Sequence, residues 1–184
     1  MALSERESWL LNFYRNSELH GALLMGRLAR TMREDDLLVE MTAHCATEAR
    51  HAAMLSRTIA SAGANLDPTI PPIQEHYSEA GGVPGTLLEI LVLSETLERR
   101  VRESYHRHLV HESPHPAAAE TIGAIVAEME AKHFAEHAGW IEGALGRLDP
   151  GAVDAARRKW QAVDANVAAR LERGLDEQFG NRTP

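Results

Sequence analysis

The uneven spacing of the breaks between helical segments most constrains the fold of this chain. Long segments with apolar residues at every third or fourth position are separated by short polar breaks near residues 34 and 114, and by one long link, 63–83, that contains prolines and glycines. Short breaks force antiparallel helical hairpins, whereas a link of this length, at about 3.3 Å per extended residue, can run past a helix of about 42 Å. The sequence therefore predicts two helical hairpins joined by one long crossover.

These segments are expected to form a single all-α domain, residues 1–184. It has a four-helix core over 4–147 and a fifth, C-terminal helix over 150–178. Ser4 and Glu7 have the spacing of a capping box and open the first helix, while Gly63 is a typical stop for the second. The low aromatic content, 5%, also favours helices over strands. The expected helices, in chain order, are 4–33, 37–62, 84–111, 117–145 and 150–178.

Composition excludes several classes of function. The formal net charge of −8 opposes binding to a nucleic-acid backbone. The single cysteine, Cys45, excludes an internal disulfide and an all-cysteine metal site. No apolar run reaches the roughly 18 residues needed to span a bilayer, and the first residues lack a signal-peptide pattern. We therefore expect a cytoplasmic protein with no nucleic-acid or membrane partner.

Four glutamates stand where the interior stripes of the core helices would otherwise be apolar: Glu18, Glu48, Glu95 and Glu130. Two of them are followed three residues later by a histidine, His51 and His133. This spacing places a carboxylate and an imidazole on the same face of a helix. By itself the Glu-x-x-His pattern is weak evidence, because two further copies occur at a helix end and across Pro114.

The heights of the four glutamates along the bundle are stronger evidence. In an antiparallel hairpin, residues equidistant from the turn lie opposite each other. The midpoint of Glu18 and Glu48 is residue 33, at the first predicted turn, and that of Glu95 and Glu130 falls between residues 112 and 113, at the second. All four carboxylates are therefore predicted to meet near mid-height.

Carboxylates that face one another in a core require protons or cations. Two divalent metals would balance four carboxylates and leave both imidazoles as neutral ligands. Oxygen-rich coordination without thiolate suits iron or manganese better than structural zinc. The alternative is that these glutamates point outward on helices whose faces are assigned wrongly.

The six residues resemble the ligand set of the ferritin-like di-iron carboxylate superfamily, over residues of about 8 to 145. That class carries a glutamate on its first and third helices and Glu-x-x-His on its second and fourth. The resemblance implies a ferritin-like bundle with two iron ions, or manganese. Glu48 and Glu130 would bridge the metals, and Glu18 and Glu95 would be terminal ligands.

The resemblance also implies a function. The expected activity is that of a di-iron oxidoreductase, of the peroxidase or oxygenase kind, that uses dioxygen or peroxide with an electron donor or small-molecule substrate that the sequence does not identify. The alternative is a ferroxidase or iron-storage subunit, and a di-manganese catalase is a third option. A homo-oligomer is expected. Haem is not, because Ala49-Arg50 stands where bacterioferritins carry a haem-binding methionine.

Several further side chains are candidates for the site. Glu98, one turn after Glu95, resembles the additional carboxylate of rubrerythrins, or else pairs with a neighbouring arginine at the surface. Tyr14, one turn before Glu18, is either a hydrogen-bonding or redox-active phenol or a core residue, while Tyr105 is assigned to the core. His44 lies one turn from Glu48, and His137 has the same relation to His133. Each is expected at the surface or behind the ligands rather than among them.

Overall fold

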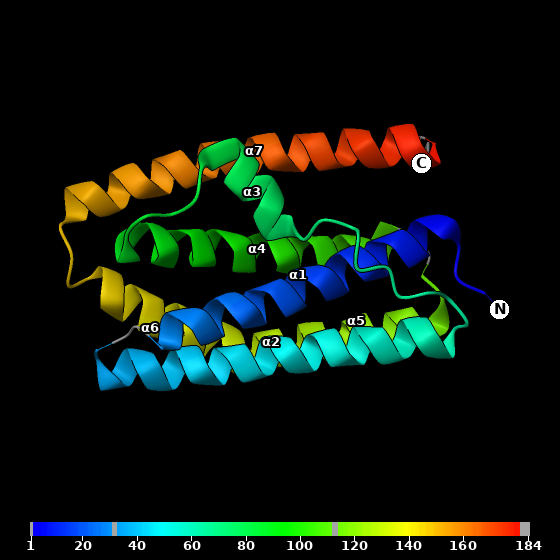
Figure 1. Ribbon diagram of the computed structural model, residues 1–184, viewed down its shortest axis with the longest axis horizontal. Helices are drawn as coiled ribbons and strands as arrows, with labels where there is room; N and C mark the ends of the chain where they lie inside the picture. Colours follow the sequence, from blue (N-terminus) through cyan, green and yellow to red (C-terminus); the bar gives the residue numbers. More distant parts are fainter. Residues whose placement is uncertain (1, 31–32, 112–113, 181–184) are drawn as a thin grey trace.

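The computed structural model describes residues 2–30, 33–111 and 114–180, except for the side chains of His111 and residues 132–138. All regular secondary structure in this part of the chain is helical (Figure 1). The elements are α1 (Glu5–Ala29), α2 (Asp35–Ser61), α3 (Ile73–Gly81), α4 (Leu87–His111), α5 (Pro116–Glu128), a π-helical turn η1 (Met129–His133), α6 (Phe134–Leu145) and α7 (Pro150–Phe179).

The long helices form the two predicted hairpins. Helix α1 packs along α2, and α4 packs against α5 and α6 (Figure 1). The link between the hairpins returns along the bundle, so that α2 and α4 run in the same direction (Figure 1). The predicted all-α fold class is confirmed for the described residues. The core contains fully buried aliphatic side chains from both hairpins, among them Leu11, Leu55, Ile59, Ile122 and Ile125.

Local sequence signals explain where the helices begin. The hydroxyl of Ser4 accepts a hydrogen bond from the amide of Glu7 at 3.1 Å, as the capping-box spacing predicts. Asp149 caps α7 in the same way, accepting from the amide of Ala152 at 2.7 Å, and Pro150 fills the first helical position. These caps set the bounds of the elements that carry the site.

The crossover contains a helix that the sequence pattern did not predict. Residues 73–81, expected to be part of an irregular link, form α3, which places Ile73 and Tyr77 in the core at a spacing of one turn. The Tyr77 hydroxyl donates a hydrogen bond to Asp164 of α7, and Arg100 of α4 binds both oxygens of the same carboxylate at 2.8 and 2.7 Å. This buried network ties the crossover to α4 and α7.

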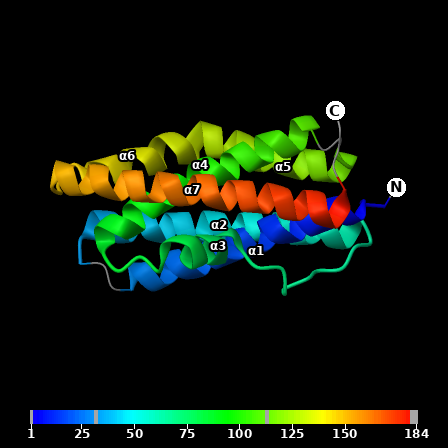
Figure 2. The ribbon, with the colours of Figure 1, turned by 90° about the horizontal axis from the view of Figure 1, so that it is seen from above.

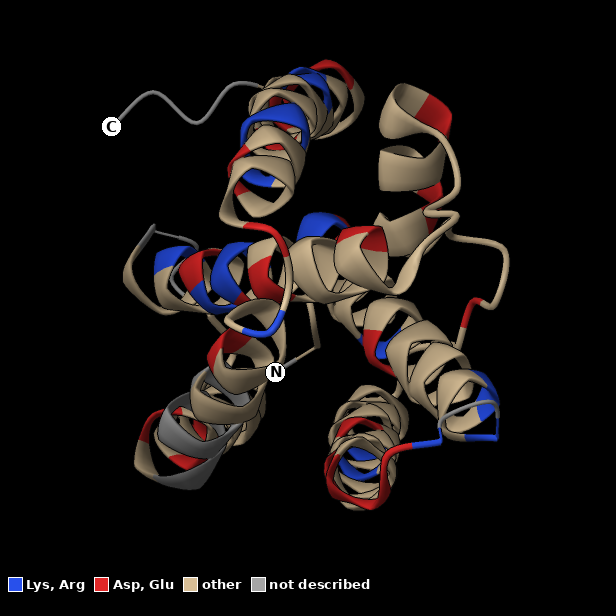
Figure 3. Cartoon of the chain, turned by 90° about the vertical axis from the view of Figure 1, so that its left-hand side faces the viewer, with Lys and Arg blue, Asp and Glu red and all other residues tan. Residues whose placement is uncertain are grey.

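The fifth helix packs on its own bundle. Its stripe of Val153, Ala156, Trp160 and Val167 is buried, with Trp160 fully enclosed. Helix α7 lies against α3 and α4, on the outside of the core hairpins (Figures 2 and 3). One face of α4 is therefore covered by α7 rather than by solvent, which affects the placement of Glu95.

The predicted fourth helix is not a uniform α-helix. Five residues, Met129–His133, adopt the wider π-helical turn between α5 and α6. A π-helical turn carries one more residue than an α-helical turn, so it changes which side chains face the core on either side of it. In the described part of the chain, no helix is long and apolar enough to cross a membrane.

Candidate metal centre

Three helices contribute acidic and imidazole side chains to one internal cluster. Helix α1 provides Glu18, helix α2 provides His44, Glu48 and His51, and helix α4 provides Glu98. On α2 the spacings of four and three residues place all three side chains on the face toward the bundle axis. They line a single internal cavity of about 40 Å³.

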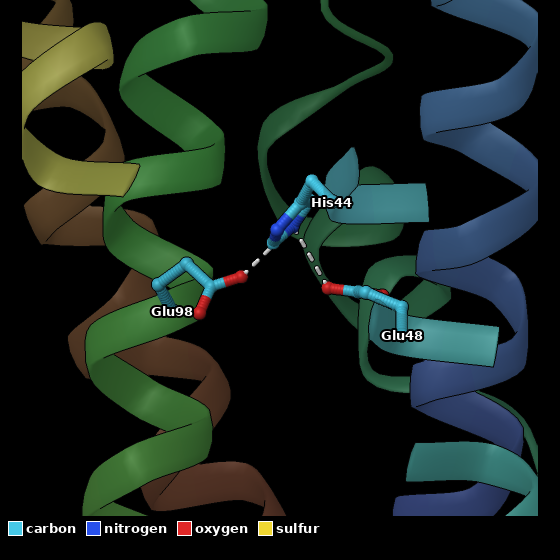
Figure 4. Close-up of side chains that lie close together, drawn as sticks. All are labelled: His44, Glu48 and Glu98. Atoms are coloured by element: carbon cyan, nitrogen blue, oxygen red, sulfur yellow. Dashed lines mark ion pairs between the residues drawn. The ribbon is translucent and has the colours of Figure 1, made fainter. Parts of the chain in front are cut away.

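His44 joins two of the carboxylates. Its Nε2 atom lies 3.0 Å from Oε1 of Glu48 and 3.1 Å from Oε1 of Glu98 (Figure 4). His44 is almost wholly buried, and each carboxylate side chain is only 14% exposed. One ligand atom from each of the three residues lies within 4.8 Å of the others, which is the geometry of a metal-binding group. Among the described residues this is the one such group of three or more.

Glu18 and His51 form the other half of the cluster. His51 Nδ1 lies 3.2 Å from Oε2 of Glu18, and the Tyr105 hydroxyl donates a hydrogen bond to Oε1 of the same carboxylate. Both oxygens of Glu18 are therefore held in place. His51 Nε2 is buried without a hydrogen-bond partner among the described residues, and its neighbour Oε2 of Glu128 is 3.6 Å away. Such an unsatisfied buried nitrogen is a free donor atom for a cation.

The electrostatics of the cluster depend on shared protons. Burial raises the pKa of Glu48 to about 7, helped by repulsion from Glu18 and Glu98 and opposed by the hydrogen bond to His44. Burial by itself lowers the pKa of His44, but the hydrogen bonds to Glu48 and Glu98 outweigh it and raise the value to about 10. The protonated imidazole of His44 thus supplies a positive charge that offsets the negative charge of the neighbouring carboxylates, Glu48 and Glu98.

The same forces act on the two residues that contact Glu18. Burial lowers the pKa of His51, but its hydrogen bond to Glu18 more than compensates, so the net shift is upward. Burial and the Glu18 charge together raise the pKa of the Tyr105 phenol well above its ordinary value. Tyr105 is therefore held as a neutral donor to Glu18.

A glycine makes room for the central carboxylate. A Cβ atom built on Gly21 would lie 1.8 Å from Oε2 of Glu48 and 2.7 Å from its Cδ. No side chain other than hydrogen at position 21 is compatible with the observed position of Glu48. Since Gly21 is three residues after Glu18, the face of α1 that carries one carboxylate also admits the other.

The residues present fit a metal site. Three glutamates and two histidines offer oxygen and imidazole donors without a thiolate in contact with them, which is the donor chemistry of iron and manganese. Glu48 is close enough to both Glu18 and Glu98 for their charges to raise its pKa. A bound cation would replace the positive charge that protons now provide.

The structure places two of the predicted ligands outside this cluster. Glu95 of α4 points toward α7, where the guanidinium of Arg157 binds both of its oxygens at 3.1 Å. Residues three apart on a helix differ by about 60° around its axis. In α4 this offset turns Glu98 toward the cluster, while Glu95 lies on the side that α7 covers. Glu98 occupies the position that the sequence assigned to Glu95.

Glu130 is likewise outside the cluster. It is exposed in the π-helical turn, with Oε1 3.2 Å from Nε2 of His106. Another acidic residue of this hairpin arm, Glu128, pairs with Arg50 and approaches His51. The wider turn that begins at residue 129 alters the register assumed for a regular helix. The side chains of His133 and His137 lie outside the described residues.

Two residues of the cluster were not assigned to it from the sequence. Tyr105 contacts Glu18, whereas Tyr14 donates to the carbonyl of Ser104 at 3.4 Å and packs edge-on against Tyr105, with ring centroids 4.8 Å apart. His44 lies between the carboxylates instead of behind them. Spacing along the helix could have identified Tyr105 from the sequence. It is seven residues after Glu98, which is two helical turns along the same face of α4.

Comparison with known proteins adds no further constraint on this site. Neither the protein-family models, nor the curated proteins, nor the solved structures yielded a match to this chain. The assignment of function therefore rests on the geometry and chemistry of the cluster.

Proposed function

We propose that this chain is a ferritin-like oxidoreductase that binds two metal ions, iron or manganese, in the cluster and uses them to reduce or activate dioxygen or peroxide. The observation that carries the proposal is the convergence of Glu18, Glu48 and Glu98, from three helices, on one internal cavity together with two histidines. Buried carboxylates in this number are costly unless they are hydrogen bonded or bound to cations. Two helical hairpins joined by one long crossover, the arrangement of ferritin-like bundles, would bring such groups to the bundle axis.

Each residue has a definite part in this proposal. Glu18, His44, Glu48, Glu98 and His51 would hold the metals, which when bound would supply Lewis acidity and electrons for reaction with the oxidant. Tyr105 and His51 fix the orientation of the Glu18 carboxylate through its two oxygens. The His44 imidazole contacts both Glu48 and Glu98 through its Nε2 atom, and these contacts hold the two carboxylates close together.

The size and lining of the cavity support a small oxidant as substrate. A volume of about 40 Å³ admits roughly three water-sized molecules, whereas pockets for organic ligands start near 300 Å³. Beside the cluster the walls are largely apolar, with Met25, Leu93, Leu97 and Met129 among them. Dioxygen and peroxide fit such a space.

A pair of isosteric substitutions tests the ligand assignment. Glu98→Gln removes a coordinating oxygen at the cluster, and we expect it to weaken metal binding at least about 100-fold, measured by calorimetric titration with Mn²⁺ or anaerobic Fe²⁺. Glu95→Gln is the matched control on the same helix, and it should leave binding unchanged because its partner is Arg157. If Glu95→Gln weakens metal binding and Glu98→Gln does not, Glu95 is the ligand from the third long helix, and the assignment of Glu98 to the metal site is refuted.

The reaction is tested on protein loaded anaerobically with Fe²⁺. Addition of dioxygen or peroxide should give a stoichiometric oxidation that stops at about two irons per chain. A faster reaction with peroxide than with dioxygen would indicate a peroxidase. Continued iron uptake into a soluble mineral, with a shell-sized particle in light scattering, would instead establish the storage function and exclude the oxidoreductase.

A further inference from the structure

A line of contacting aromatic rings runs along the bundle from the cluster. Tyr105 and Tyr14 pack edge-on with centroids 4.8 Å apart, and Tyr14 lies 6.0 Å from Phe13. Phe13 stacks on Trp9 at 5.3 Å with an interplanar angle of 10°. All of these separations are within the range of direct aromatic contact. Tyr105 is fully buried, and Tyr14 and Phe13 are 6% exposed, so water does not interrupt the line.

The two ends of this line differ in their surroundings. At the inner end, the Tyr105 hydroxyl donates a hydrogen bond to Glu18, one of the proposed metal-binding carboxylates. At the outer end, Trp9 is partly exposed and lines an open groove of about 510 Å³, together with Asn12 and Phe179. The rings therefore connect the interior cluster with the surface.

We propose that Tyr105, Tyr14, Phe13 and Trp9 form an electron path between the carboxylate cluster and the surface groove. The proposal rests on the function proposed above, because it supplies the route by which electrons reach an oxidant at the buried site. It assigns Tyr105 as the inner terminus, Trp9 as the outer terminus, and the rings of Tyr14 and Phe13 as the bridge. The third tyrosine, Tyr77, takes no part, because its hydroxyl is bonded to Asp164 on the other side of α4.

The transfer balances in protons and electrons. Tyr105 gives up one electron at a time toward the site, and its phenolic proton moves along the existing hydrogen bond to Glu18. An electron then passes from Trp9 through the bridging rings to Tyr105, which takes its proton back from Glu18. Trp9 releases its indole proton to water and is restored by a one-electron reductant in solution and a proton from water. Two such transfers and two protons convert one peroxide into two water molecules.

Pulse radiolysis of the metal-free protein tests the path without the metals. Azide radicals oxidise tryptophan, and in the wild-type protein we expect an electron to pass from a tyrosine to the tryptophanyl radical along the same rings, in the direction opposite to the proposed reaction. The tryptophanyl radical should then decay as a tyrosyl radical forms, at a rate independent of protein concentration. Trp9→Phe should lose this phase, and so should the double variant Tyr14→Phe with Tyr105→Phe. Tyr77→Phe is the matched control and should retain it. Circular dichroism melts establish that each variant is folded.

The role of Glu18 as proton acceptor has its own readout. Glu18→Gln keeps the shape of the side chain but removes the basic carboxylate. In the single variant Tyr14→Phe, where Tyr105 is the nearest tyrosine, this change should slow tyrosyl radical formation on the order of 10²-fold. An unaltered rate would refute the proton step.

The outcomes of these experiments are separable. Transfer that persists in Trp9→Phe, or that disappears in Tyr77→Phe, would overturn the path. A wild-type protein that binds no metal in the calorimetric titrations would overturn the proposed function without affecting the radical measurement, since the latter contains no metal.

Discussion

Substitution of Gly21 by alanine tests the cluster with the smallest change that the chain allows. The added methyl group would lie 1.8 Å from Oε2 and 3.2 Å from Oε1 of Glu48. Both separations are shorter than van der Waals contact, so the carboxylate must leave its position beside His44. The hydrogen bond between Glu48 and His44 would be lost with it.

Two opposing terms determine the change in stability. Forcing the Glu48 carboxylate from its position, beside a cavity that leaves it some room, costs about 1 to 3 kcal/mol. Replacing a glycine by alanine inside a helix stabilises by about 0.5 to 1 kcal/mol. A Cβ atom added to Gly174 of α7 would meet no heavy atom within 4 Å beyond its own helical backbone and chain neighbours, so Gly174→Ala isolates the second term. The difference between the two variants is the cost of displacing the carboxylate, about 1 to 3 kcal/mol.

The assay is urea denaturation of both variants in the presence of a chelator, followed by metal titration. We expect Gly174→Ala to be slightly more stable than the wild type, and Gly21→Ala to be less stable than Gly174→Ala by the amount above. Metal affinity should fall at least about 10-fold in Gly21→Ala alone. If both variants gain the same stability and bind metal like the wild type, Glu48 does not occupy the space beside Gly21 and the reasoning fails.

Other predictions concern the packing of α7. Trp160→Ala should lower the free energy of unfolding by about 3 to 5 kcal/mol, since its side chain is fully buried, and a change below about 1 kcal/mol in chemical denaturation would contradict that packing. Deletion of residues 150–184 should lower the melting temperature, because α7 covers α4, and an unaltered melt would refute this. Burial alone raises the pKa of Asp164, but the bonds from Arg100 and Tyr77 hold it below its ordinary value. A lowered pKa stabilises the fold above the unfolded value near 3.8 and loses that effect as pH falls through the folded value. Asp164→Asn should therefore cost roughly 3 kcal/mol at neutral pH and much less near pH 2, and a pH-independent difference in the free energy of unfolding would refute the ionic network.

Much of the fold was predictable because helices and hairpins follow from local rules. Apolar spacing, the caps at Ser4 and Asp149, and the unequal links are properties of short stretches of sequence, and they require no knowledge of distant contacts. The same rules predict that Glu18, Glu48 and His51 lie together, since a hairpin with a short turn fixes which residues lie level with one another. In the structure these three residues line the same cavity.

The rotation of α4 about its axis could not be predicted from its own residues. Glu95 and Glu98 are one turn apart on adjacent stripes, and either assignment leaves an apolar stripe toward the core. The choice is made by α7, whose Arg157 binds Glu95 and whose packing covers that face. The rotation of α4 is therefore decided by contacts between segments that are about 60 residues apart in the sequence.

The sequence by itself therefore determined the long helices, their pairing and the carboxylate-rich interior, because periodicity and turn length act locally, but it did not predict α3 or the π-helical turn. The tertiary structure decided which side chains meet there. It placed Glu98 in the cluster, His44 between two carboxylates and Tyr105 on Glu18, while the π-helical turn left Glu130 at the surface. The physical reason is that helix rotation and register are set by the packing of whole faces, a sum over many distant contacts that no single segment encodes.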